Sequence, residues 1–438
     1  MDRLAHVDHE LTRRIAVIGG GWAGLSCAVQ LAAAGRRVCV FEAARQLGGR
    51  ARRIETYGGP LDNGQHILLG AYRETLRVMR LAGADPEHLL QRHALELDYP
   101  ARGFRMGLPR LPAPLHLAVG LLSARGCSPG EKFAAARFMR ALQADAYRVD
   151  DQVTVAELLD HHRQYGSIRR LLWEALCLAA LNTAPENASA QIFANVLRDS
   201  LGGSREDTDL LLPNADLGQV FPDAAARFIT GLAGEIRLST RVNSVAPLLA
   251  GDGEAFAQVV IAVAPQHAAP LLHALPETGG IAAMLDGYDF EPITTVYLGY
   301  PGNVHLPFPM LGMDIGTPGH HGQWVFDRGQ LGGAAGIMGF VLSARGAWDE
   351  LGNDRLAATL HEELQDVLQE KLPPPLWHKT IRERRATFSC RPGLQRPPSR
   401  TPHRGLWLAG DYVCADYPAT LEGAVRSGVA AAQDILAG

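Results

Sequence analysis

The chain has 438 residues, of which 47% are hydrophobic, and a formal net charge of −4 at pH 7. This length allows two domains with a large core, and the charge excludes the broad basic surface typical of nucleic-acid binding. Six scattered cysteines, without C-x-x-C or a His/Cys cluster at metal spacing, predict reduced thiols, no metal site and a cytoplasmic protein. Residues 1–13 are too polar for a signal peptide.

The first unit along the chain is a buried strand, a glycine turn and a helix. The strand is predicted over residues 15–18 and the helix over 25–35, with Gly19, Gly21 and Gly24 between them as G-x-G-x-x-G. The first glycine permits the tight turn, and the second leaves room for a pyrophosphate beside backbone N–H groups. The third lets helix and strand pack closely.

A second predicted strand, residues 38–41, ends at Glu42. A carboxylate at this distance from the glycine turn can accept hydrogen bonds from both ribose hydroxyls of an adenosine. The pattern predicts a dinucleotide site, and the alternative is a glycine turn that holds no ligand.

A second glycine pair decides which dinucleotide is expected. Gly48, Gly49 and Arg50 follow directly after the acidic strand end, and this run resembles the start of the flavin amine oxidase and phytoene desaturase superfamily. The resemblance implies FAD, with the glycine pair and the arginine against its pyrophosphate. Arg50 could neutralise phosphate charge that a helix N-terminus leaves uncompensated.

The next motif, LDNGQHILLGAY at residues 61–72, resembles a narrower family, the hydroxysqualene dehydroxylases of hopanoid biosynthesis. In the superfamily the corresponding segment passes beside the isoalloxazine ring. The resemblance therefore implies that Asp62, Gly64, Gln65 and His66 line the flavin face. For His66 the alternative is a polar residue that caps the end of a strand.

Residues 102–140 combine an apolar stretch with an excess of positive charge. The apolar part, residues 112–122, is too short to span a bilayer, and Glu131 is the one acid among seven basic residues. Such a segment suits peripheral contact with anionic lipid, which would place the protein on the inner face of the cell membrane. The alternative is a buried helix with a solvated basic rim.

Helical periodicity is predicted over residues 171–200, with a break at 182–185. The run CLAALNTAPENASAQIFANVLRDS also resembles the dehydroxylase family, in which the corresponding helices help to wall the substrate chamber. From the residues alone these are two core helices.

The chain then returns to the nucleotide domain. We expect a helix over residues 216–233, strands over 235–245 and 258–263, and a shortened connection over 246–257. The superfamily resemblance implies that Val242 lies against the FAD adenine.

Strands are predicted over residues 293–300 and 337–342, and an amphipathic helix over 354–371. Flavin amine oxidases commonly place a lysine in a strand of this region, where it assists reoxidation. Here the strand carries Thr294 and Thr295, and none of the three lysines is close to it in sequence. Amine oxidation is therefore disfavoured.

The C-terminal motif, LWLAGDYVCADYPATLEGAVRSG, supplies the other half of the expected site. A strand over residues 405–409 leads to Gly410 and Asp411, and a helix begins near Thr420. Asp411 could bind the ribityl or pyrophosphate part of FAD. Free N–H groups at the helix start would favour the anionic reduced flavin.

These motifs predict an α/β fold, a glutathione-reductase-like FAD-binding Rossmann domain with an inserted α+β substrate domain. The FAD domain is expected from residues 1–70, 213–268 and 401–438, and the substrate domain from 71–212 and 269–400. The predicted FAD contacts are Gly19, Gly21, Trp22, Ala23, Gly24, Glu42, Ala43, Gly48, Gly49, Arg50, Gly64, Gln65, Val242, Gly410, Asp411, Thr420, Leu421 and Glu422.

The resemblance implies reductive replacement of the hydroxyl of hydroxysqualene, a C30 isoprenoid, by hydride. His66 or Asp416 is the candidate acid, and Tyr417 is the candidate ring facing a cation. A carotenoid or polyprenoid desaturase is the first alternative, a flavin amine oxidase the second, and a non-catalytic FAD-binding scaffold or lipid-carrier protein the third. No second nucleotide motif identifies the electron donor.

Overall fold

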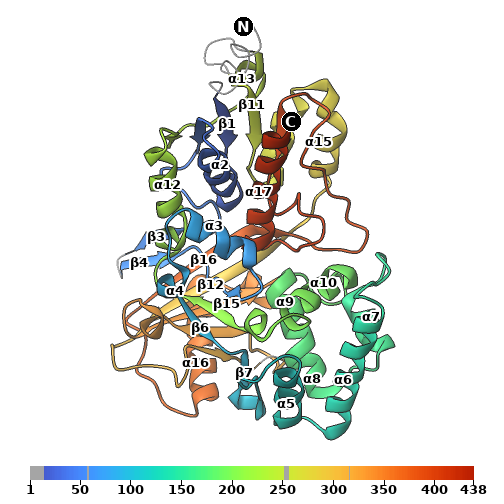
Figure 1. Ribbon diagram of the computed structural model, residues 1–438. Helices are drawn as coiled ribbons and strands as arrows, with labels where there is room; N and C mark the ends of the chain where they lie inside the picture. Colours follow the sequence, from blue (N-terminus) through green and yellow to red (C-terminus); the bar gives the residue numbers. More distant parts are fainter. Residues whose placement is uncertain (1–13, 57–58, 251–255, 315) are drawn as a thin grey trace.

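The computed structural model describes residues 14–438 apart from 57–58, 251–255 and 315. The expectation for residues 1–13 and part of the connection 246–257 therefore lie outside the described residues. Figure 1 shows a parallel sheet with its helices at one end of the molecule, and a second sheet and a group of helices at the other.

The parallel sheet has five strands in the order β10-β2-β1-β11-β17. Their bounds are Ile15–Ile18 for β1, Val38–Phe41 for β2, Glu235–Arg237 for β10, Gln258–Ile261 for β11 and Leu406–Leu408 for β17. Strands β1, β2 and β17 are buried at every position, as expected for apolar strands covered on both faces. The sheet thus joins three distant parts of the chain.

Helix α2 (Trp22–Ala33) packs between α12 (Pro222–Gly231) and α17 (Leu421–Ala437) (Figure 1). The predicted helix over 216–233 is in fact two helices, α11 (Leu217–Val220) and α12. The break falls at Phe221 because Pro222, which has no N–H to donate, begins the second helix.

The strand predicted over residues 235–245 ends early, at Arg237. Beyond it, Ser239 N–H donates to Ala44 O and Thr240 N–H donates to Glu42 O, both at 2.8 Å. These bonds draw the chain away from the sheet and across the end of β2. The shortened connection predicted after it begins with a single helical segment, α13 (Ala246–Ala250).

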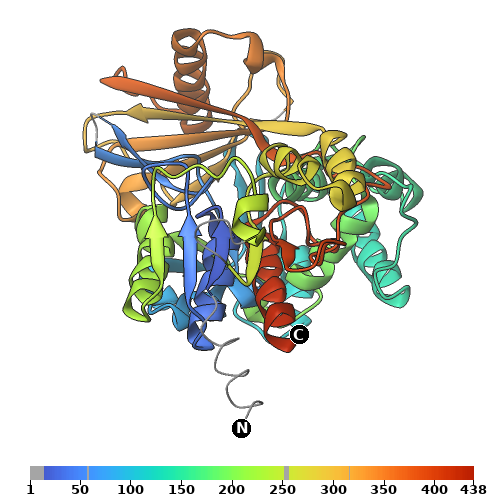
Figure 2. The same ribbon diagram turned by 90° about the horizontal axis from the view of Figure 1, so that it is seen from above.

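The second sheet is antiparallel, in the order β13-β14-β15-β12-β16. Its strands are β12 (Phe290–Gly299), β13 (Met310–Gly312), β14 (Trp324–Asp327), β15 (Ile337–Ser343) and β16 (Trp377–Phe388). Helix α16 (Asn353–Leu368) buries its apolar stripe against this sheet. In Figure 2 this sheet and the parallel sheet lie in separate layers.

A group of helices lies beside the second sheet (Figures 1 and 2). They are α5 (Leu115–Ser123), α6 (Pro129–Ala144), α7 (Val155–His161), α8 (Gly166–Ile168), α9 (Ala175–Leu181) and α10 (Ala190–Leu201). The predicted break at residue 182 is confirmed, because Asn182 adopts a left-handed conformation with φ 48° and ends α9.

Small elements connect these layers. They include the hairpins β3 (Arg53–Thr56) with β4 (Gly59–Asp62) and β7 (Glu96–Tyr99) with β8 (Phe104–Gly107), and the sheet β5 (Leu68–Leu69), β9 (Leu210–Pro213), β6 (Leu90–His93). Helices α3 (Arg73–Leu81), α4 (Pro86–Leu89), α14 (Pro265–His273) and α15 (Gly279–Asp286) complete the fold.

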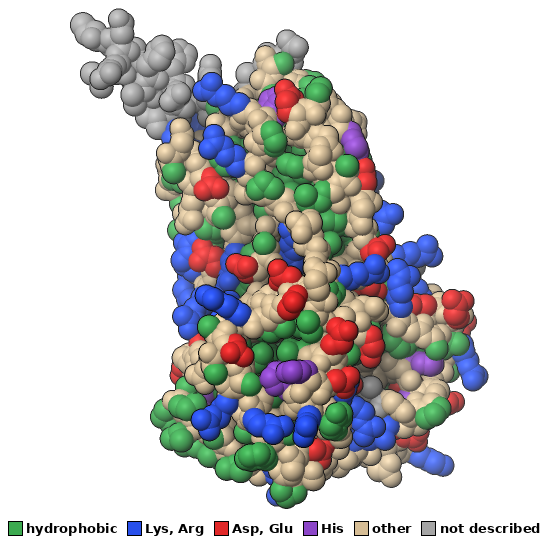
Figure 3. Space-filling model, turned by 90° about the vertical axis from the view of Figure 1, so that its right-hand side faces the viewer, with side chains coloured by type: hydrophobic (Ala, Val, Ile, Leu, Met, Phe, Trp, Pro, Cys, Tyr) green, Lys and Arg blue, Asp and Glu red, His purple; other side chains and the backbone are tan. Residues whose placement is uncertain are grey.

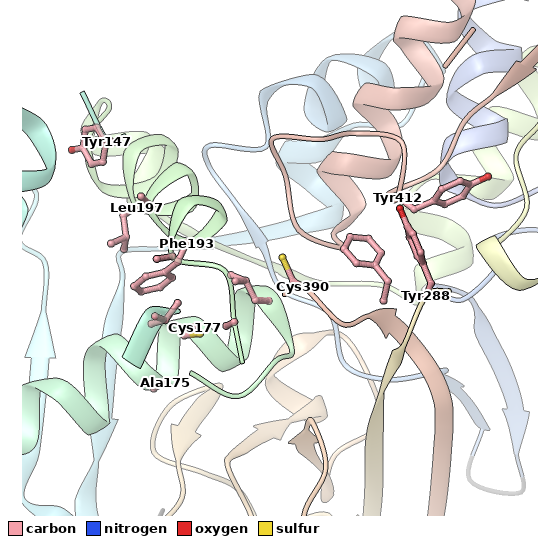
Figure 4. Close-up of a cluster of buried hydrophobic side chains, with 14 of the residues drawn as sticks. Tyr147, Ala175, Cys177, Phe193, Leu197, Tyr288, Cys390 and Tyr412 are labelled. Atoms are coloured by element: carbon pink, nitrogen blue, oxygen red, sulfur yellow. The ribbon is translucent and has the colours of Figure 1, made fainter. Parts of the chain in front are cut away.

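One buried apolar cluster extends from the helical group into the parallel sheet. In Figure 4 Cys390 lies between Cys177 and Phe193 on one side and the adjacent rings of Tyr288 and Tyr412 on the other. All six cysteines are unpaired, as predicted. Among the described residues, none of the helices combines the length and apolarity needed to cross a bilayer.

Candidate functional site

A cavity of about 770 Å³ lies between the parallel sheet and the antiparallel sheet. Its wall includes the predicted residues Gly19, Gly21, Trp22, Ala23, Glu42, Ala43, Gly48, Gly49, Arg50, Gly64, Gln65, His66, Val242, Gly410, Asp411, Thr420 and Leu421. Residues from both ends of the chain and from its middle therefore meet at one place. Five predicted residues are absent from this wall, namely Gly24, Asp62, Asp416, Tyr417 and Glu422.

The three glycines of the first turn have different roles. Gly19 has a φ of +112°, and a Cβ there would lie 2.5 Å from Ala262 O. A Cβ on Gly24 would overlap the carbonyl of Gly19, so Gly24 serves the close packing of helix on strand rather than the cavity. A Cβ on Gly21 would meet nothing nearer than Gly49 Cα at 3.8 Å. A larger residue at position 21 would not clash with the protein. Its side chain would fill part of the cavity, so glycine at this position keeps the cavity open.

The second glycine pair lies directly against the first turn. Gly48 N–H donates to Gly20 O at 2.8 Å, and Gly21 and Gly48 form a parallel bridge. Trp22 Nε1–H also donates to Ala51 O at 3.2 Å. The two motifs thus form one backbone surface at the start of α2, where free N–H groups and the helix dipole favour an anion.

Glu42 is held by its own backbone surroundings. Its carboxylate accepts hydrogen bonds from Gly20 N–H and Ala44 N–H, each at 2.7 Å. These bonds fix the carboxylate at the cavity wall beside the glycine turn. Oxygen lone pairs that remain can accept hydroxyl donors from a bound ribose.

Arg50 connects two parts of the cavity wall. Its guanidinium pairs with Asp411 at 2.6 Å and donates to Ala386 O at 2.5 Å. Asp411 was expected to contact the ribityl or pyrophosphate part of FAD directly. In the structure one of its oxygens is paired with Arg50, and the other accepts Tyr412 N–H at 3.1 Å.

The start of α17 forms another part of the wall. Thr420 caps the helix by accepting a hydrogen bond from Gly423 N–H at 3.1 Å, and Leu421 and Ala424 face the cavity. The position of Glu422 differs from the sequence prediction, which made this residue a FAD contact. Its fully buried carboxylate accepts Thr75 N–H at 2.9 Å and pairs with Arg426, so the side chain fastens α17 to α3 and does not contact the cavity.

The segment 62–66 is fixed from behind by a buried ion pair. Asp62 lies 3.3 Å from Arg328 and also accepts Leu217 N–H at 2.8 Å, and both charged side chains are almost fully buried. Burial raises the pKa of Asp62 to about 6, although Arg328 opposes the rise. Tyr297 O–H donates to the Asp62 backbone carbonyl at 3.0 Å. Asp62 thus supports the 63–66 loop from behind and does not line the cavity.

His66 lies on the cavity wall, as predicted. Its Nδ1 is 3.1 Å from Gly64 O, and because a carbonyl can only accept, Nδ1 carries the proton. Among the described residues no partner occupies Nε2. Burial lowers the pKa of His66, against the opposing effect of the Gly64 hydrogen bond, so the neutral ring predominates at pH 7.

The other two catalytic candidates lie elsewhere, which corrects the prediction. The side chain of Asp416 is exposed, and its backbone carbonyl accepts a hydrogen bond from Asn195. The buried ring of Tyr417 lies 4.2 Å from the Arg426 guanidinium and borders a separate cavity of about 20 Å³. Arg396 donates to the carbonyls of Cys414 and Tyr417, which turns this loop away from the larger cavity.

Several wall residues were not identified from the sequence. Asn182 donates to Thr387 Oγ1 at 3.0 Å and accepts Ala344 N–H at 2.7 Å, which joins α9 to the antiparallel sheet at the cavity. The other unpredicted polar wall residues include Tyr72, Arg241, His267, Glu383 and Arg385. Asn182 could have been identified from the sequence, because it is a polar residue at a predicted helix break. The other residues belong to no motif.

Lys379 lies closer to the strand of Thr295 than its position in the sequence indicates. Lys379 is distant from Thr295 in sequence, but it lies in β16 opposite Tyr297 of β12, the neighbouring strand. Its side chain is exposed and does not line the cavity, whereas Thr295 is buried and does. Among the described residues the cavity wall contains no lysine and no group of side chains suited to a metal ion.

Comparison with known families gives one match across the chain. Residues 22–436 match the family described as flavin containing amine oxidoreductase, so the chain belongs to this family. It is a FAD-dependent oxidoreductase. The geometry fits this cofactor, because open space at Gly21, the carboxylate of Glu42 and the start of α17 face one cavity.

Relatives resemble the chain over its whole length. A hydroxysqualene dehydroxylase from Rhodopseudomonas palustris is 28% identical, covering 98% of this chain and 99% of the relative. A hydroxysqualene dehydroxylase from Sinorhizobium fredii is 26% identical over 96% and 98% of the two chains. A 15-cis-phytoene desaturase from Synechococcus elongatus is 23% identical over 97% and 96%.

Solved structures share the fold. An oxidoreductase from Methanosarcina mazei has a TM-score of 0.72 at 14% identity, covering 96% of this chain and all of that one. Putrescine oxidase bound to putrescine has a TM-score of 0.68 at 17% identity, covering 98% of this chain and all of that one. The predicted α/β fold with a Rossmann-type FAD domain is confirmed.

Proposed function

We propose that this protein replaces the hydroxyl of hydroxysqualene by hydride and so forms squalene. The observation that carries the proposal is the similarity to hydroxysqualene dehydroxylases from end to end of both chains. The reaction consumes one hydride and one proton, breaks one C–O bond, forms one C–H bond and releases water.

One end of the cavity is formed by the 63–66 loop, α9, β12 and β16, and we call it the reaction end. Its apolar side chains support a hydrocarbon substrate. Apolar side chains reach it from α9, β12 and β16, including Ala180, Ile293 and Ile381. Polar side chains from the same part of the fold also line it, namely Asn182, Thr295, Ser343, Glu383, Arg385 and Thr387. The apolar side chains can contact a hydrocarbon chain, and the polar side chains can orient its hydroxyl.

The same wall argues against amine oxidation. Thr295 stands in the strand where amine oxidases commonly carry a lysine, and it lies near Gly64, since a Cβ on Gly64 would be 3.6 Å from Thr295 Oγ1. The exposed Lys379 does not replace that group.

Bound FAD in its reduced form supplies the hydride. The glycine turns, Glu42 and the start of α17 would hold the cofactor, and the Asp62–Arg328 pair fixes the 63–66 loop at the cavity wall. His66 is our candidate for the group at the leaving hydroxyl. Its Nε2 takes up a proton from solvent, and the protonated ring donates this proton to the departing hydroxyl oxygen, which leaves as water.

The function is tested anaerobically with purified protein, reduced FAD and hydroxysqualene. Squalene should form in a single turnover, together with oxidised flavin absorbance. If flavin stays reduced and squalene is absent, the proposal fails, and the same result with all lipids tried would favour a non-catalytic FAD-binding protein.

A carotenoid or polyprenoid desaturase is the second candidate, supported by the similarity to phytoene desaturase. Such an enzyme transfers hydride in the opposite direction, from substrate to oxidised FAD. Incubation of the oxidised enzyme with phytoene separates the two, because new conjugated double bonds would identify the desaturase. The physiological electron donor stays unassigned in either case.

A further inference from the structure

Helices α5 and α6 present an apolar surface that is not covered by the rest of the protein. In Leu115–Ser123, the side chains of Leu115, Val119 and Leu122 are 55%, 39% and 72% exposed, and Phe133 at the start of α6 is 71% exposed. Figure 3 shows hydrophobic side chains gathered at this end of the molecule, with Lys and Arg beside them. We call Leu115, Val119, Leu122 and Phe133 the apolar patch.

The spacing of these residues explains why they share one face. Leu115, Val119 and Leu122 follow one another at intervals of four and three, which aligns them along one side of α5. The opposite side carries His116 and Gly120, both buried against the rest of the domain. The helix contains no charged residue, so its outer side has no polar cover. The buried-helix alternative from the sequence therefore describes only its inner side.

Basic side chains surround the apolar patch. Exposed Arg110 and Arg125 flank α5, and Arg137 and Arg140 continue the stripe of Phe133 along α6 at intervals of four and three. Among the described residues, no ion pair engages any of these four arginines. Lys132 donates to Leu122 O at 2.7 Å at the end of α5.

Glu131, the acidic residue within α6, is held by other contacts. The carboxylate of Glu131 accepts hydrogen bonds from Ser128 N–H and Ser167 N–H, which hold it between α6 and α8. Four unpaired arginines thus surround an uncovered apolar face. Exposed apolar side chains elsewhere, such as Leu232 and Leu376, lie outside α5 and α6.

We propose that the apolar patch and its arginines dock this protein on the surface of an anionic lipid bilayer. Apolar side chains would enter the boundary between headgroups and acyl chains while the arginines contact lipid phosphates. Charge complementarity favours an anionic bilayer over an apolar protein partner, because arginines flank the apolar patch on α5 and on α6. Helix α5 lies along the surface, since its nine residues cannot span a bilayer.

The test is co-flotation of the purified FAD-loaded protein with vesicles. Phosphatidylcholine vesicles containing phosphatidylglycerol should carry the protein to the top of a density gradient, and pure phosphatidylcholine vesicles should carry much less. Leu122→Ser with Phe133→Ser should weaken partitioning at least about tenfold. Arg137→Gln with Arg140→Gln should weaken it by about fivefold for each arginine at low salt.

Matched variants control for general changes in surface character. Leu232→Ser with Leu376→Ser removes two exposed leucines elsewhere, and Arg37→Gln with Arg404→Gln removes two exposed arginines from the FAD domain. Both pairs should float like the wild type. Circular dichroism and bound-flavin absorbance check that every variant is folded.

Equal loss in control and patch variants, or no flotation with phosphatidylglycerol, overturns the proposal. Sedimentation velocity tests a second copy of the chain as the occupant. A dimer that Leu122→Ser with Phe133→Ser converts to monomer, without vesicle binding by the wild type, would assign the patch to self-association and reject the membrane. Flotation requires no turnover, so its failure is separate from failure of the proposed reaction.

Discussion

The two ends of the cavity are built by different means. The cofactor end consists largely of backbone, where Gly21, Gly48 and the first N–H groups of α2 and α17 create space and donors. The reaction end consists of side chains from the 63–66 loop, α9, β12 and β16. A backbone surface restricts residue type at fixed positions, whereas a side-chain wall can be built in many ways. The first end can therefore be recognised from a sequence motif, whereas the second end carries no such motif.

The largest effect is expected when the cofactor end is filled. Gly21→Val should abolish FAD binding and turnover, because the new side chain enters open cavity space. Its φ of −78° and ψ of 179° suit valine, so unfolding free energy should fall by only about 1 kcal/mol. Flavin absorbance after gel filtration and urea unfolding give the two quantities.

Gly24→Val is the matched control, since its side chain would collide with the Gly19 carbonyl. It should lose both stability and FAD, with overpacking costing about 1–3 kcal/mol or more. Equal stability loss in the two variants would contradict the distinction between cavity and packing glycines.

The reaction end is tested at His66. His66→Gln should lower the single-turnover rate by about 10²–10⁴-fold, the usual contribution of a general acid. FAD absorbance should be unchanged, because His66 is not among the nearest neighbours of the glycines in either turn. Anaerobic stopped-flow absorbance measures both, and an unchanged rate would remove His66 from the mechanism.

The pH dependence sharpens the same assignment. Because burial lowers the pKa of His66, the protonated ring is lost as pH rises through a value below 6.5. The wild-type rate should therefore fall with rising pH across that value. The glutamine variant should lack this limb of the profile, whereas a limb that persists would assign the titration to another group.

A stability effect is expected where the reaction end is supported from behind. Arg328→Met leaves the Asp62 carboxyl buried without its partner, which should cost about 3–5 kcal/mol at pH 7. The folded pKa of Asp62, about 6, is above its ordinary value of 3.8, so proton uptake stabilises the folded state as pH falls through this range.

Without Arg328 the pKa of Asp62 should rise further, so Asp62 should be protonated and uncharged at acid pH. The loss of unfolding free energy in the variant should therefore be smaller at acid pH than at pH 7. Urea unfolding at pH 5 and pH 7 measures the change. A deficit that is constant with pH would mean that Asp62 is not the group left uncompensated.

The smallest effect is expected at Asp416. Its side chain is exposed and outside the cavity, so Asp416→Asn should leave turnover and FAD binding within about twofold, as for most surface substitutions. A tenfold loss of single-turnover rate would restore it as a candidate acid.

The sequence predicted the cofactor end well because backbone geometry dictated its residues. Gly19 requires a positive φ, and Glu42 follows the strand that carries it to the cavity. The error at Glu422 has a different origin. Its position at the start of α17 was right, but its buried contact with α3 depends on residues 74–75, which no local pattern connects to it.

The reaction end was predicted only in part. His66 belongs to the motif that begins at Asp62, and the structure places it on the cavity wall. Asp416 and Tyr417 were misplaced because Arg396, a residue outside every motif, turns their loop away. Glu383 and Arg385 were missed because a wall residue in a strand differs from its neighbours only in the direction of its side chain.

The order of strands in the parallel sheet also constrains how the protein is made. Strand β17 pairs with β11, and α17 packs on α2, so a ribosome must synthesise almost the whole described chain before these contacts form. Until then the nascent chain leaves the β11 edge and the face of α2 that binds α17 uncovered. We therefore expect flavin to bind stably only after β17 and α17 have been made.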